Sequence, residues 1–502
     1  MVENVLDWLD ATAGALPDKI AFDDTEGTLS FSALREEAKR IASGLLRHTR
    51  PRQVVAVLAG RCALTPAIYL SAVCAGCCYA PLDSEAPPDR LLRILENTRP
   101  CALLADREHW ELARELAFDG PVLSVEELRQ TPIDEENLAR IRACSAADDP
   151  LYIIFTSGSS GVPKGVITSQ ESLIHYLDAY ASVVGIDRED ILGCQSPLSY
   201  IAAIRDIYLP IRCGASTVII PKKLFSLPKK LFALLNEKRV SAIGWSVSAF
   251  TLPTSLGVFK TMKPETLRKI SFSGSVMPCR CLRVWQEALP EARFVHQYGP
   301  TETTASCSYY VVDHVVSDDE VLPIGTPYRN YRMFLLNEDN TPTEPGKLGE
   351  ICVGGPCVTL GYYRDKTRTE AAFLQNPLHD DYRDIVYKTG DLGRLREDGL
   401  FEFHGRKDRQ IKHFGHRVEL DELEECAKGA EGIRECAALY YAEKEQITLF
   451  YCGDATDRSI ATYMREKLPG FMVPRRFVRL DEMPRLSNGK TDMQSLRKNY
   501  FT

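Results

Sequence analysis

The sequence predicts an α/β protein with layered β-sheets, followed by a β-rich segment and a small α+β domain. From about residue 50 to 320, short β-branched runs alternate with amphipathic segments, which is the pattern of largely parallel sheets covered by helices. From about 323 to 405, strands and Gly-Asp or Asp-Gly turns replace the long helices, which indicates hairpins. After Arg406 a polar stretch leads into a last segment of about 95 residues, within the usual size of one domain.

The individual elements follow from local patterns. Apolar runs rich in β-branched residues predict strands at 53–59, 101–105, 151–157, 216–221, 240–246 and 267–274. Amphipathic stretches at 90–95 and 231–238 predict helices between them. The last segment is expected to hold helices at 419–429 and 459–468 among its strands. We therefore predict two domains, 1–407 and 408–502, joined by a short polar hinge.

Composition and charge exclude several classes of function. The 502 residues are 44% hydrophobic and 26% charged, with a net charge of −8, the usual balance of a globular protein. The lysine pairs at 222–223 and 229–230 are short and typical of solvated surface, whereas nucleic-acid binding needs a strong basic excess. No stretch reaches the ~18 apolar residues of a membrane span, and the acidic N-terminus has no secretory pattern. We expect a cytoplasmic protein that binds neither nucleic acid nor membrane.

Sixteen cysteines are scattered along the chain. Cys74 and Cys77 have redox spacing, and Cys279 with Cys281 could suggest a metal, but no second CxxC or HxxxH completes a zinc set. The run around Cys77 is typical of a helix end that turns into a strand. We expect reduced, structural thiols.

The segment TSGSSGVPKG at 156–165 directly follows the apolar strand LYIIF. Its glycines allow sharp turns close to a ligand, its hydroxyl and amide groups can donate to phosphate oxygens, and Lys164 adds positive charge. It is not a GxxxxGK[ST] P-loop, because the lysine precedes the last glycine. A generic flexible loop is the alternative. The candidate phosphate-binding residues are Thr156, Ser157, Gly158, Ser159, Ser160, Gly161 and Lys164.

A second segment, HQYGPTETT at 296–304, contains a Gly-Pro turn signal. Such a turn is expected to hold Tyr298, Thr301 and Glu302 on one side. An aromatic ring can stack on a purine, a threonine can donate to a phosphate, and a carboxylate can hold Mg²⁺. An ordinary turn is the alternative.

Two further segments add charged candidates. Asp391 at a Thr-Gly-Asp turn can accept hydrogen bonds from ribose hydroxyls, as acidic residues do in other nucleotide folds. Arg406 can offset the negative charge of a phosphate. Lys490 follows the tight-turn dipeptide Asn-Gly near the C-terminus. The alternatives are a charged hairpin for the first two residues and a solvated lysine for the third.

Together these segments resemble the adenylate-forming superfamily of acyl- and aryl-CoA synthetases, luciferases and peptide-synthetase adenylation domains. The ordered matches cover nearly the whole chain: 28–38, 75–91, 156–165, QYGPTE, 349–373, YKTGDLGRL, 405–424 and LSNGK. The residues within these motifs are most similar to those of stand-alone nonribosomal peptide synthetase adenylation domains and of D-alanine–carrier protein ligases.

The resemblance implies a core at 1–407 that binds ATP and an acid, and a mobile domain at 408–502 that rotates about Asp408. The acid's carboxylate attacks the α-phosphate of Mg-ATP, and a thiol then takes the acyl group. By position, the 156–165 loop holds the β- and γ-phosphates, Tyr298 with Gln297 and Gly299 lies at adenine, and Asp391 binds the ribose. The resemblance implies catalytic roles for Thr301, Glu302 and Lys490, with Glu302 as the Mg²⁺ ligand; the 410–417 loop with Gly415 serves the thiol step.

The pocket for the acid departs from the family pattern. Tyr200 keeps the usual aromatic residue, but Ile201 stands where amino-acid-activating relatives have an aspartate, and an unpaired ammonium there costs free energy. A standard α-amino acid is therefore in doubt. Arg205 can pair with a second acidic group on the substrate or point outward, and Asp206 can hold a displaced amine. The pocket candidates are Tyr200, Ile201, Ala202, Arg205, Gly244, Ser273, Gln297, Ala305 and Ser306.

Three functions stay open. The favoured one is a ligase that loads the phosphopantetheine of a separate acyl or peptidyl carrier protein, since the sequence contains no carrier-like segment. The second is an acyl- or aryl-CoA ligase with coenzyme A as acceptor. The third is a non-catalytic nucleotide-binding relative, which need not keep every phosphate contact from Lys164 to Lys490.

Overall fold

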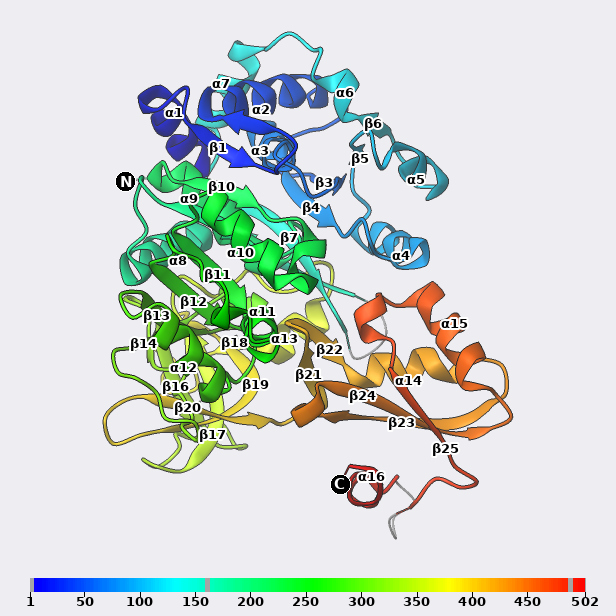
Figure 1. Cartoon of the computed structure of the whole chain (residues 1–502). Helices are drawn as coiled ribbons and strands as arrows, with labels where there is room; N and C mark the ends of the chain where they lie inside the picture. The colour runs from blue at the N-terminus through cyan, green and yellow to red at the C-terminus, as the bar shows by residue number, and fades with distance from the viewer. Residues whose placement is uncertain (1–3, 159–162, 486–490, 502) are drawn as a thin grey trace. The chain divides into compact units, whose positions relative to one another are not determined.

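The computed structural model describes residues 4–158, 163–485 and 491–501. The chain forms two compact units (Figure 1). The first contains Met1–Ser84, Thr98–Ile154 and Gly165–Lys407, and the second contains Glu85–Asn97, Phe155–Lys164 and Asp408–Thr502. The division of the sequence into domains at 1–407 and 408–502 stays a prediction.

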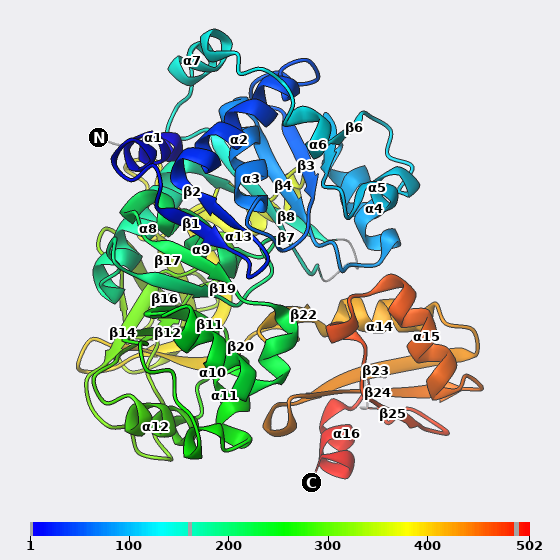
Figure 2. The same ribbon diagram turned by 45° about the horizontal axis from the view of Figure 1, so that its top comes forward.

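A six-stranded sheet has the order β6-β5-β3-β4-β7-β8. Its neighbours from β6 to β7 pair in parallel, which the alternation of strands and helices predicts. Helices α2 and α3 lie beside β3 and β4 (Figure 2). The strands are β3 (Val54–Leu58), β4 (Cys78–Leu82), β5 (Ala102–Ala105), β6 (Val122–Ser124), β7 (Pro150–Thr156) and β8 (Lys164–Ser169). The helices of this part are α1 (Val5–Ala15), α2 (Phe31–Leu45), α3 (Thr65–Cys74), α4 (Pro88–Thr98), α5 (Trp110–Glu115), α6 (Val125–Leu128) and α7 (Glu135–Ala143).

A nine-stranded sheet has the order β15-β14-β13-β12-β11-β9-β10-β1-β2. Strands β9 to β13 pair in parallel, and β14 returns antiparallel to β13. The strands are β1 (Ile20–Asp23), β2 (Thr28–Ser30), β9 (Ile191–Cys194), β10 (Ser216–Ile219), β11 (Ala242–Ser246), β12 (Lys269–Ser273), β13 (Arg293–Tyr298), β14 (Ser308–Val312) and β15 (Thr326–Pro327). The helices between them are α8 (Gln170–Val184), α9 (Ile204–Cys213), α10 (Pro228–Glu237), α11 (Val247–Ser255) and α12 (Cys279–Ala288).

The β-rich segment forms an antiparallel sheet, β16-β17-β19-β18, with β20 paired to β19. Its strands are β16 (Arg332–Leu336), β17 (Leu348–Gly354), β18 (Phe373–Gln375), β19 (Ile385–Leu395) and β20 (Phe401–Arg406). The helix of this segment, α13 (Lys366–Ala372), is short. This antiparallel sheet, together with the two largely parallel sheets, confirms the predicted α/β class with a β-rich part.

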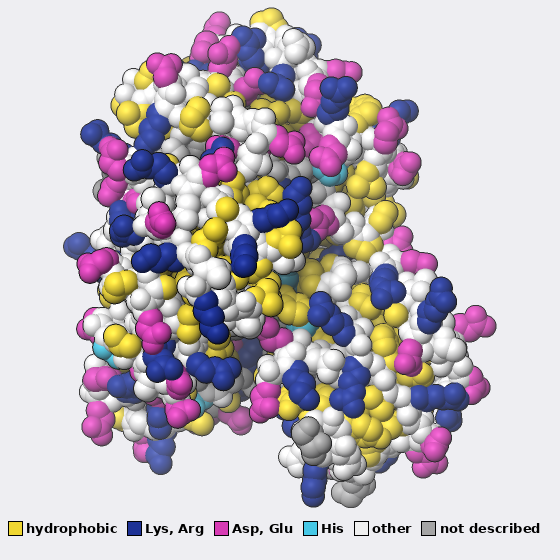
Figure 3. All heavy atoms as spheres, in the orientation of Figure 1, with side chains coloured by type: hydrophobic (Ala, Val, Ile, Leu, Met, Phe, Trp, Pro, Cys, Tyr) yellow, Lys and Arg dark blue, Asp and Glu magenta, His cyan; other side chains and the backbone are white. Residues whose placement is uncertain are grey.

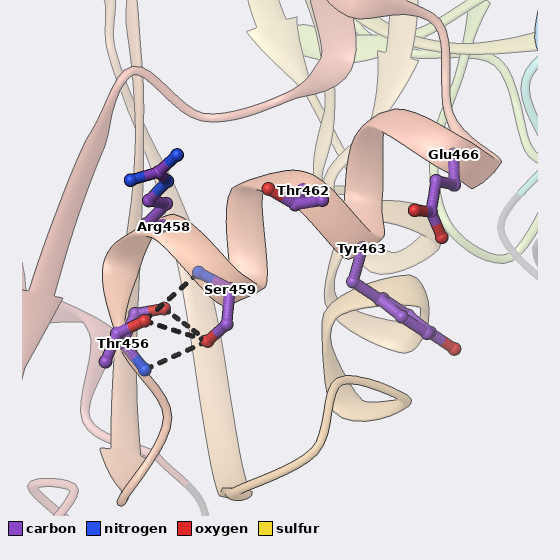
Figure 4. A pocket seen from close by; sticks show the side chains of 6 residues that line it. All are labelled: Thr456, Arg458, Ser459, Thr462, Tyr463 and Glu466. Atoms are coloured by element: carbon purple, nitrogen blue, oxygen red, sulfur yellow. Dashed lines mark hydrogen bonds between the residues drawn. The ribbon is translucent and has the colours of Figure 1, made fainter.

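In the second unit, helices α14 (Leu420–Lys428) and α15 (Asp457–Lys467) belong with the sheet β23-β24-β25. The strands are β23 (Ile433–Tyr441), β24 (Gln446–Gly453) and β25 (Arg476–Arg479), and α16 (Met493–Tyr500) follows. Helix α15 begins with a capping box, in which the side chains of Thr456 and Ser459 each bond the other residue's backbone N–H (Figure 4). This pairing satisfies N–H groups of the first turn.

The stretch 410–417, predicted as a loop, is a hairpin of β21 (Gln410–His413) and β22 (His416–Glu419). Its two turn residues, Phe414 and Gly415, both have left-handed backbone with φ of 50° and 80°. Positive φ at both positions is the signature of a tight hairpin turn. The sequence did not reveal it, because phenylalanine is unusual at such a position.

The first pair of cysteines lies where a helix end turns into a strand, as predicted. Cys74 ends α3, and Cys77 immediately precedes β4. Burial raises the pKa of each thiol to about 12, so both stay protonated at neutral pH. Within the described residues, no group of three or more His, Cys, Asp or Glu could hold a metal ion.

The surface carries charges of both signs. Figure 3 shows Lys and Arg side chains interspersed with Asp and Glu over the visible face. Over the described ranges, no helix has the length and apolarity to cross a membrane.

Candidate active site

The first unit brings three of the predicted nucleotide residues into contact. Tyr298 ends β13, and its hydroxyl donates to Asp391 Oδ2 at 2.5 Å, across 93 residues of sequence. Arg406 Nη1 donates to the other oxygen of Asp391. Burial, with the nearby Asp391 carboxylate, raises the pKa of Tyr298 well above its usual value, so the phenol remains a donor. A carboxylate offers about four acceptor sites, so Asp391 keeps capacity for further hydroxyl groups.

Glu302 lies in a 3-10 turn, Thr301–Thr303, and its side chain is fully buried. The hydroxyl of Tyr362 donates to Glu302 Oε1 at 2.7 Å, and the backbone oxygen of Glu302 accepts from the N–H of Thr359 at 3.1 Å. The bond from Tyr362 therefore holds one oxygen of this buried carboxylate in position.

The turn that carries Glu302 is strained. Thr304 and Ala305 both have left-handed backbone, with φ of 52° and 73°, and each such non-glycine residue costs roughly 1–3 kcal/mol. The hydroxyl of Thr304 donates to Cys357 O at 2.8 Å and holds this bend. A Cβ on Gly299 would lie 2.5 Å from Ser306 Cα, so only glycine allows the backbone to approach there. Strain of this kind persists where surrounding contacts fix it, often at functional sites.

One of the residues predicted for the acid pocket is a buried charge. Arg205, on α9, is 3% exposed, and its Nη2 donates to Gly244 O on β11. A Cβ on Gly244 would meet the guanidinium, 2.8 Å from Cζ, so glycine makes room for the arginine. The alternative in which Arg205 points outward to a surface acid is therefore wrong. Its ion-pair partner is the buried Asp206, with Nε and Oδ1 4.0 Å apart.

Several buried polar atoms around this pocket have no hydrogen-bond partner within the described residues. They are Arg205 Nε, Asp206 Oδ2 and Gln297 Nε2. Buried polar groups are normally hydrogen-bonded, so these atoms can receive a polar ligand or water. Gln297 itself accepts from Ser306 Oγ at 3.1 Å. Burial raises the pKa of Asp206 to about 6, although Arg205 opposes the shift.

The remaining pocket candidates lie in several different elements of the chain. Tyr200 donates its hydroxyl to Asp83 Oδ2 at 3.0 Å. Ile201 and Ala202 belong to the 3-10 turn that precedes α9. Ser273 ends β12, and it and Ala305 are half-buried.

In the second unit, the described part of the phosphate loop binds carboxylate oxygens. Gly158 N–H donates to Glu422 Oε2 at 3.3 Å, and Lys164 Nζ lies 3.8 Å from Glu419 Oε1. Arg90 Nη1 donates to the other oxygen of Glu422 at 2.9 Å. Gly158 and Lys164 thus bind anionic oxygen atoms within the protein, and we call this segment the anion-binding loop. That it binds phosphate stays a prediction.

The other loop candidates have different positions. Thr156 ends β7, and its hydroxyl is buried without a partner among the described residues. Ser157 donates its hydroxyl to Arg417 O at 2.9 Å. Ser159, Ser160, Gly161 and Lys490 lie outside the described residues.

Sequence reasoning missed Tyr362, Asp83, Glu419 and Glu422. Each acts on another predicted residue through a contact between segments far apart in the chain. All four fall inside stretches that match the family, but a stretch that matches does not indicate which of its side chains meet.

Glu302 can contribute to a magnesium site. Mg²⁺ is usually held by one or two carboxylates together with substrate phosphates and water, so one buried carboxylate suffices on the protein side. The hydrogen bond from Tyr362 to Oε1 would orient Glu302 for this role.

This α/β chain joins Tyr298 and Arg406 to Asp391 by hydrogen bonds and has an anion-binding loop rich in glycine and serine. These are features expected of an adenylate-forming enzyme. Residues 9–363 match the family described as "AMP-binding enzyme". The chain belongs to this family. Membership of this family makes it an AMP-forming ligase, and adenylate-forming enzymes use ATP.

Known proteins support this assignment over nearly the whole chain. Delta-poly-L-ornithine synthetase of Acinetobacter baumannii is 30% identical over 98% of this chain, which spans 36% of that relative's length. The structure of holo-PA1221, a nonribosomal peptide synthetase protein with adenylation and PCP domains, is 25% identical, with a TM-score of 0.84 over 99% of this chain and 84% of that one. The Vibrio cholerae adenylation domain AlmE, solved with glycyl-adenosine-5'-phosphate, is 21% identical, with a TM-score of 0.86 over 99% and 98%. The last likeness shows the fold alone.

Proposed function

We propose that this enzyme activates a carboxylic acid as acyl-AMP and then transfers the acyl group to the phosphopantetheine thiol of a separate carrier protein. The observation that carries the proposal is the anion-binding loop, in which Gly158 and Lys164 bind carboxylate oxygens. In the first unit, the hydrogen bonds from Tyr298 and Arg406 to Asp391 support a site for the nucleoside part of ATP.

In the first step, a carboxylate oxygen of the acid forms a bond to the α-phosphorus of ATP, and the bond to pyrophosphate breaks. The loop 156–165 holds the β- and γ-phosphates, and Thr301 donates to the α-phosphate. Lys490 stabilises the charge that develops between the carboxylate and the phosphate. Mg²⁺ held by Glu302 would offset charge on the phosphate oxygens. Such a reaction gains mostly from alignment and charge stabilisation.

In the second step, the thiol sulfur forms a bond to the acyl carbon, AMP leaves with the former carboxylate oxygen, and the thiol proton passes to solvent. We propose that the domain 408–502 rotates about Asp408 between the two steps and brings the turn at Gly415 to the thiol. Asp408 is the first residue of its segment in the second unit, which suits a hinge.

The acid is proposed to be other than a standard α-amino acid. Ile201 offers no partner to an α-ammonium group, and burying that charge unpaired is costly. The buried Arg205 and Asp206 provide donor and acceptor atoms for a polar group further along the acid.

ATP–pyrophosphate exchange over a panel of amino, aryl, hydroxy and dicarboxylic acids tests the activation step. We expect one acid class to stimulate exchange, and Lys490→Ala to lower its rate by roughly 10²–10³. Normal exchange in this variant would remove Lys490 from the mechanism.

The acceptor is tested separately, by offering holo carrier protein or coenzyme A to the acyl-AMP complex. Thioester on the carrier alone supports the proposal. Thioester on coenzyme A alone would instead make the enzyme a CoA ligase.

A further inference from the structure

A second pocket lies in the first unit, at the amino-terminal edge of the six-stranded sheet. Its volume is about 340 Å³. Val54, Cys78 and Pro150, the first residues of β3, β4 and β7, line it together with Cys101, which precedes β5. Strand β7 leads from this pocket wall to Thr156 at its other end, which is the start of the anion-binding loop. None of the described residues of the segment 156–165 lines the pocket.

Three arginines and no acidic residue line this pocket. They are Arg52, Arg99 and Arg364. Arg52 Nε lies 3.1 Å from Asp149 Oδ1, whereas Arg99 and Arg364 form no ion pair with any described residue. Three positive charges with one offset by Asp149 leave two. A phosphate monoester carries about −1.5 to −2 at neutral pH, which matches this excess.

The backbone at these arginines is unusual. Arg52, Arg99 and Arg364 all have left-handed conformation, with φ of 68°, 45° and 54°. Arg99 directly follows α4, where glycine is the usual residue because it has no Cβ. Arginine is not among the residues enriched in this conformation. Strained backbone at a non-glycine residue motivates a functional hypothesis, and at each of these three positions the side chain carries a positive charge to the pocket.

We propose that this pocket binds the phosphoryl group of a small phosphate monoester, with Arg99 and Arg364 as its principal ligands. A guanidinium group can donate two parallel N–H hydrogen bonds to the oxygens of one phosphate group. Ile153 and Ile167 in the pocket wall leave apolar surface for the organic part of such a metabolite. The proposal is independent of the adenylation chemistry.

Calorimetric titration of the full chain tests the proposal. The nucleotide site is first saturated with a non-hydrolysable ATP analogue, so that the phosphate loop does not contribute. Ribose 5-phosphate, inorganic phosphate and succinate are then titrated into the wild type, Arg99→Gly and Arg364→Gly. The matched control is Arg239→Gly. Arg239 is also an exposed arginine with left-handed backbone, φ 54°, two residues beyond the end of helix α10, and it lies outside the pocket.

We expect ribose 5-phosphate to bind the wild type at least as tightly as inorganic phosphate does. Arg99→Gly and Arg364→Gly should each weaken binding roughly tenfold, with an unchanged or higher Tm, because glycine relieves the left-handed backbone. Arg239→Gly should keep wild-type affinity.

Three results would overturn the proposal. One is equal affinity in the wild type and both pocket variants. Another is an equal loss of affinity in Arg239→Gly. The third is preferential binding of succinate, or of inorganic phosphate without ribose 5-phosphate, which would exclude a phosphate monoester as the ligand.

Discussion

Gly244→Ala tests the packing of the acid pocket most sharply. The new Cβ would overlap the guanidinium of Arg205, 2.8 Å from Cζ, and lie 2.9 Å from the hydroxyl of Tyr180. Because Arg205 is enclosed, 3% exposed, it has to leave its rotamer and its bond to Gly244 O. We therefore expect both lower stability and a changed preference for the acid.

The expected cost follows from these contacts. Overpacking a core position costs about 1–3 kcal/mol, and a hydrogen bond from a charged group contributes about 1.5–3 kcal/mol. A combined loss of about 3 kcal/mol should lower Tm by roughly 4 °C in a unit of this size. In an Arg205→Ala background the main clash is absent, so Gly244→Ala should then cost less than about 1 kcal/mol.

The assay is a double-mutant cycle by thermal and urea unfolding, with ATP–pyrophosphate exchange on the acid panel for each variant. Gly14→Ala is the matched control, because a Cβ there meets nothing within 4 Å in helix α1. It should stabilise the protein by roughly 0.5–1 kcal/mol. Additive effects of the two pocket substitutions, within about 0.5 kcal/mol, would refute contact between Arg205 and Gly244.

Two other changes have defined outcomes. Tyr362→Phe removes the 2.7 Å bond to Glu302, so the exchange rate at limiting Mg²⁺ should fall roughly tenfold or more; an unchanged Mg²⁺ dependence would exclude this positioning role. Asp206 has a pKa of about 6 in the folded protein, above its ordinary value. Its contribution to the free energy of unfolding is therefore full below about pH 4 and is lost as pH rises through about 6. The total loss is on the order of 3 kcal/mol. Asp206→Asn lacks this loss, and its Tm should fall less than that of the wild type between pH 5 and 7.5; parallel Tm curves would contradict it.

The sequence predicted the α/β class and several strands of the two large sheets, such as β3, β5 and β11, because buried strands have a local signature of apolar, β-branched residues. It also predicted Tyr298, Asp391 and Arg406, which the fold brings into direct contact. The partners of these residues were harder to predict. Tyr362 reaches Glu302 across 60 residues, and no periodicity encodes such a contact.

Arg205 illustrates the same limit at the level of one side chain. Its residue type left an outward and an inward orientation open. The absence of a Cβ on Gly244, 39 residues away, decides between them. The three pocket arginines likewise lie in separate segments, at 52, 99 and 364, and only the folded sheet places them around one pocket.

The attack of an organic acid on the innermost phosphorus of ATP can be followed with an oxygen isotope. The purified enzyme is given ATP, Mg²⁺, a thiol acceptor and the activating acid labelled with ¹⁸O in its carboxylate, and the AMP formed is weighed by mass spectrometry. We predict that each AMP molecule carries one ¹⁸O atom, because the bridging oxygen of the acyl-adenylate stays with phosphorus when the thiol attacks carbon. Unlabelled AMP, or ADP and phosphate in its place, would contradict adenylation of the acid.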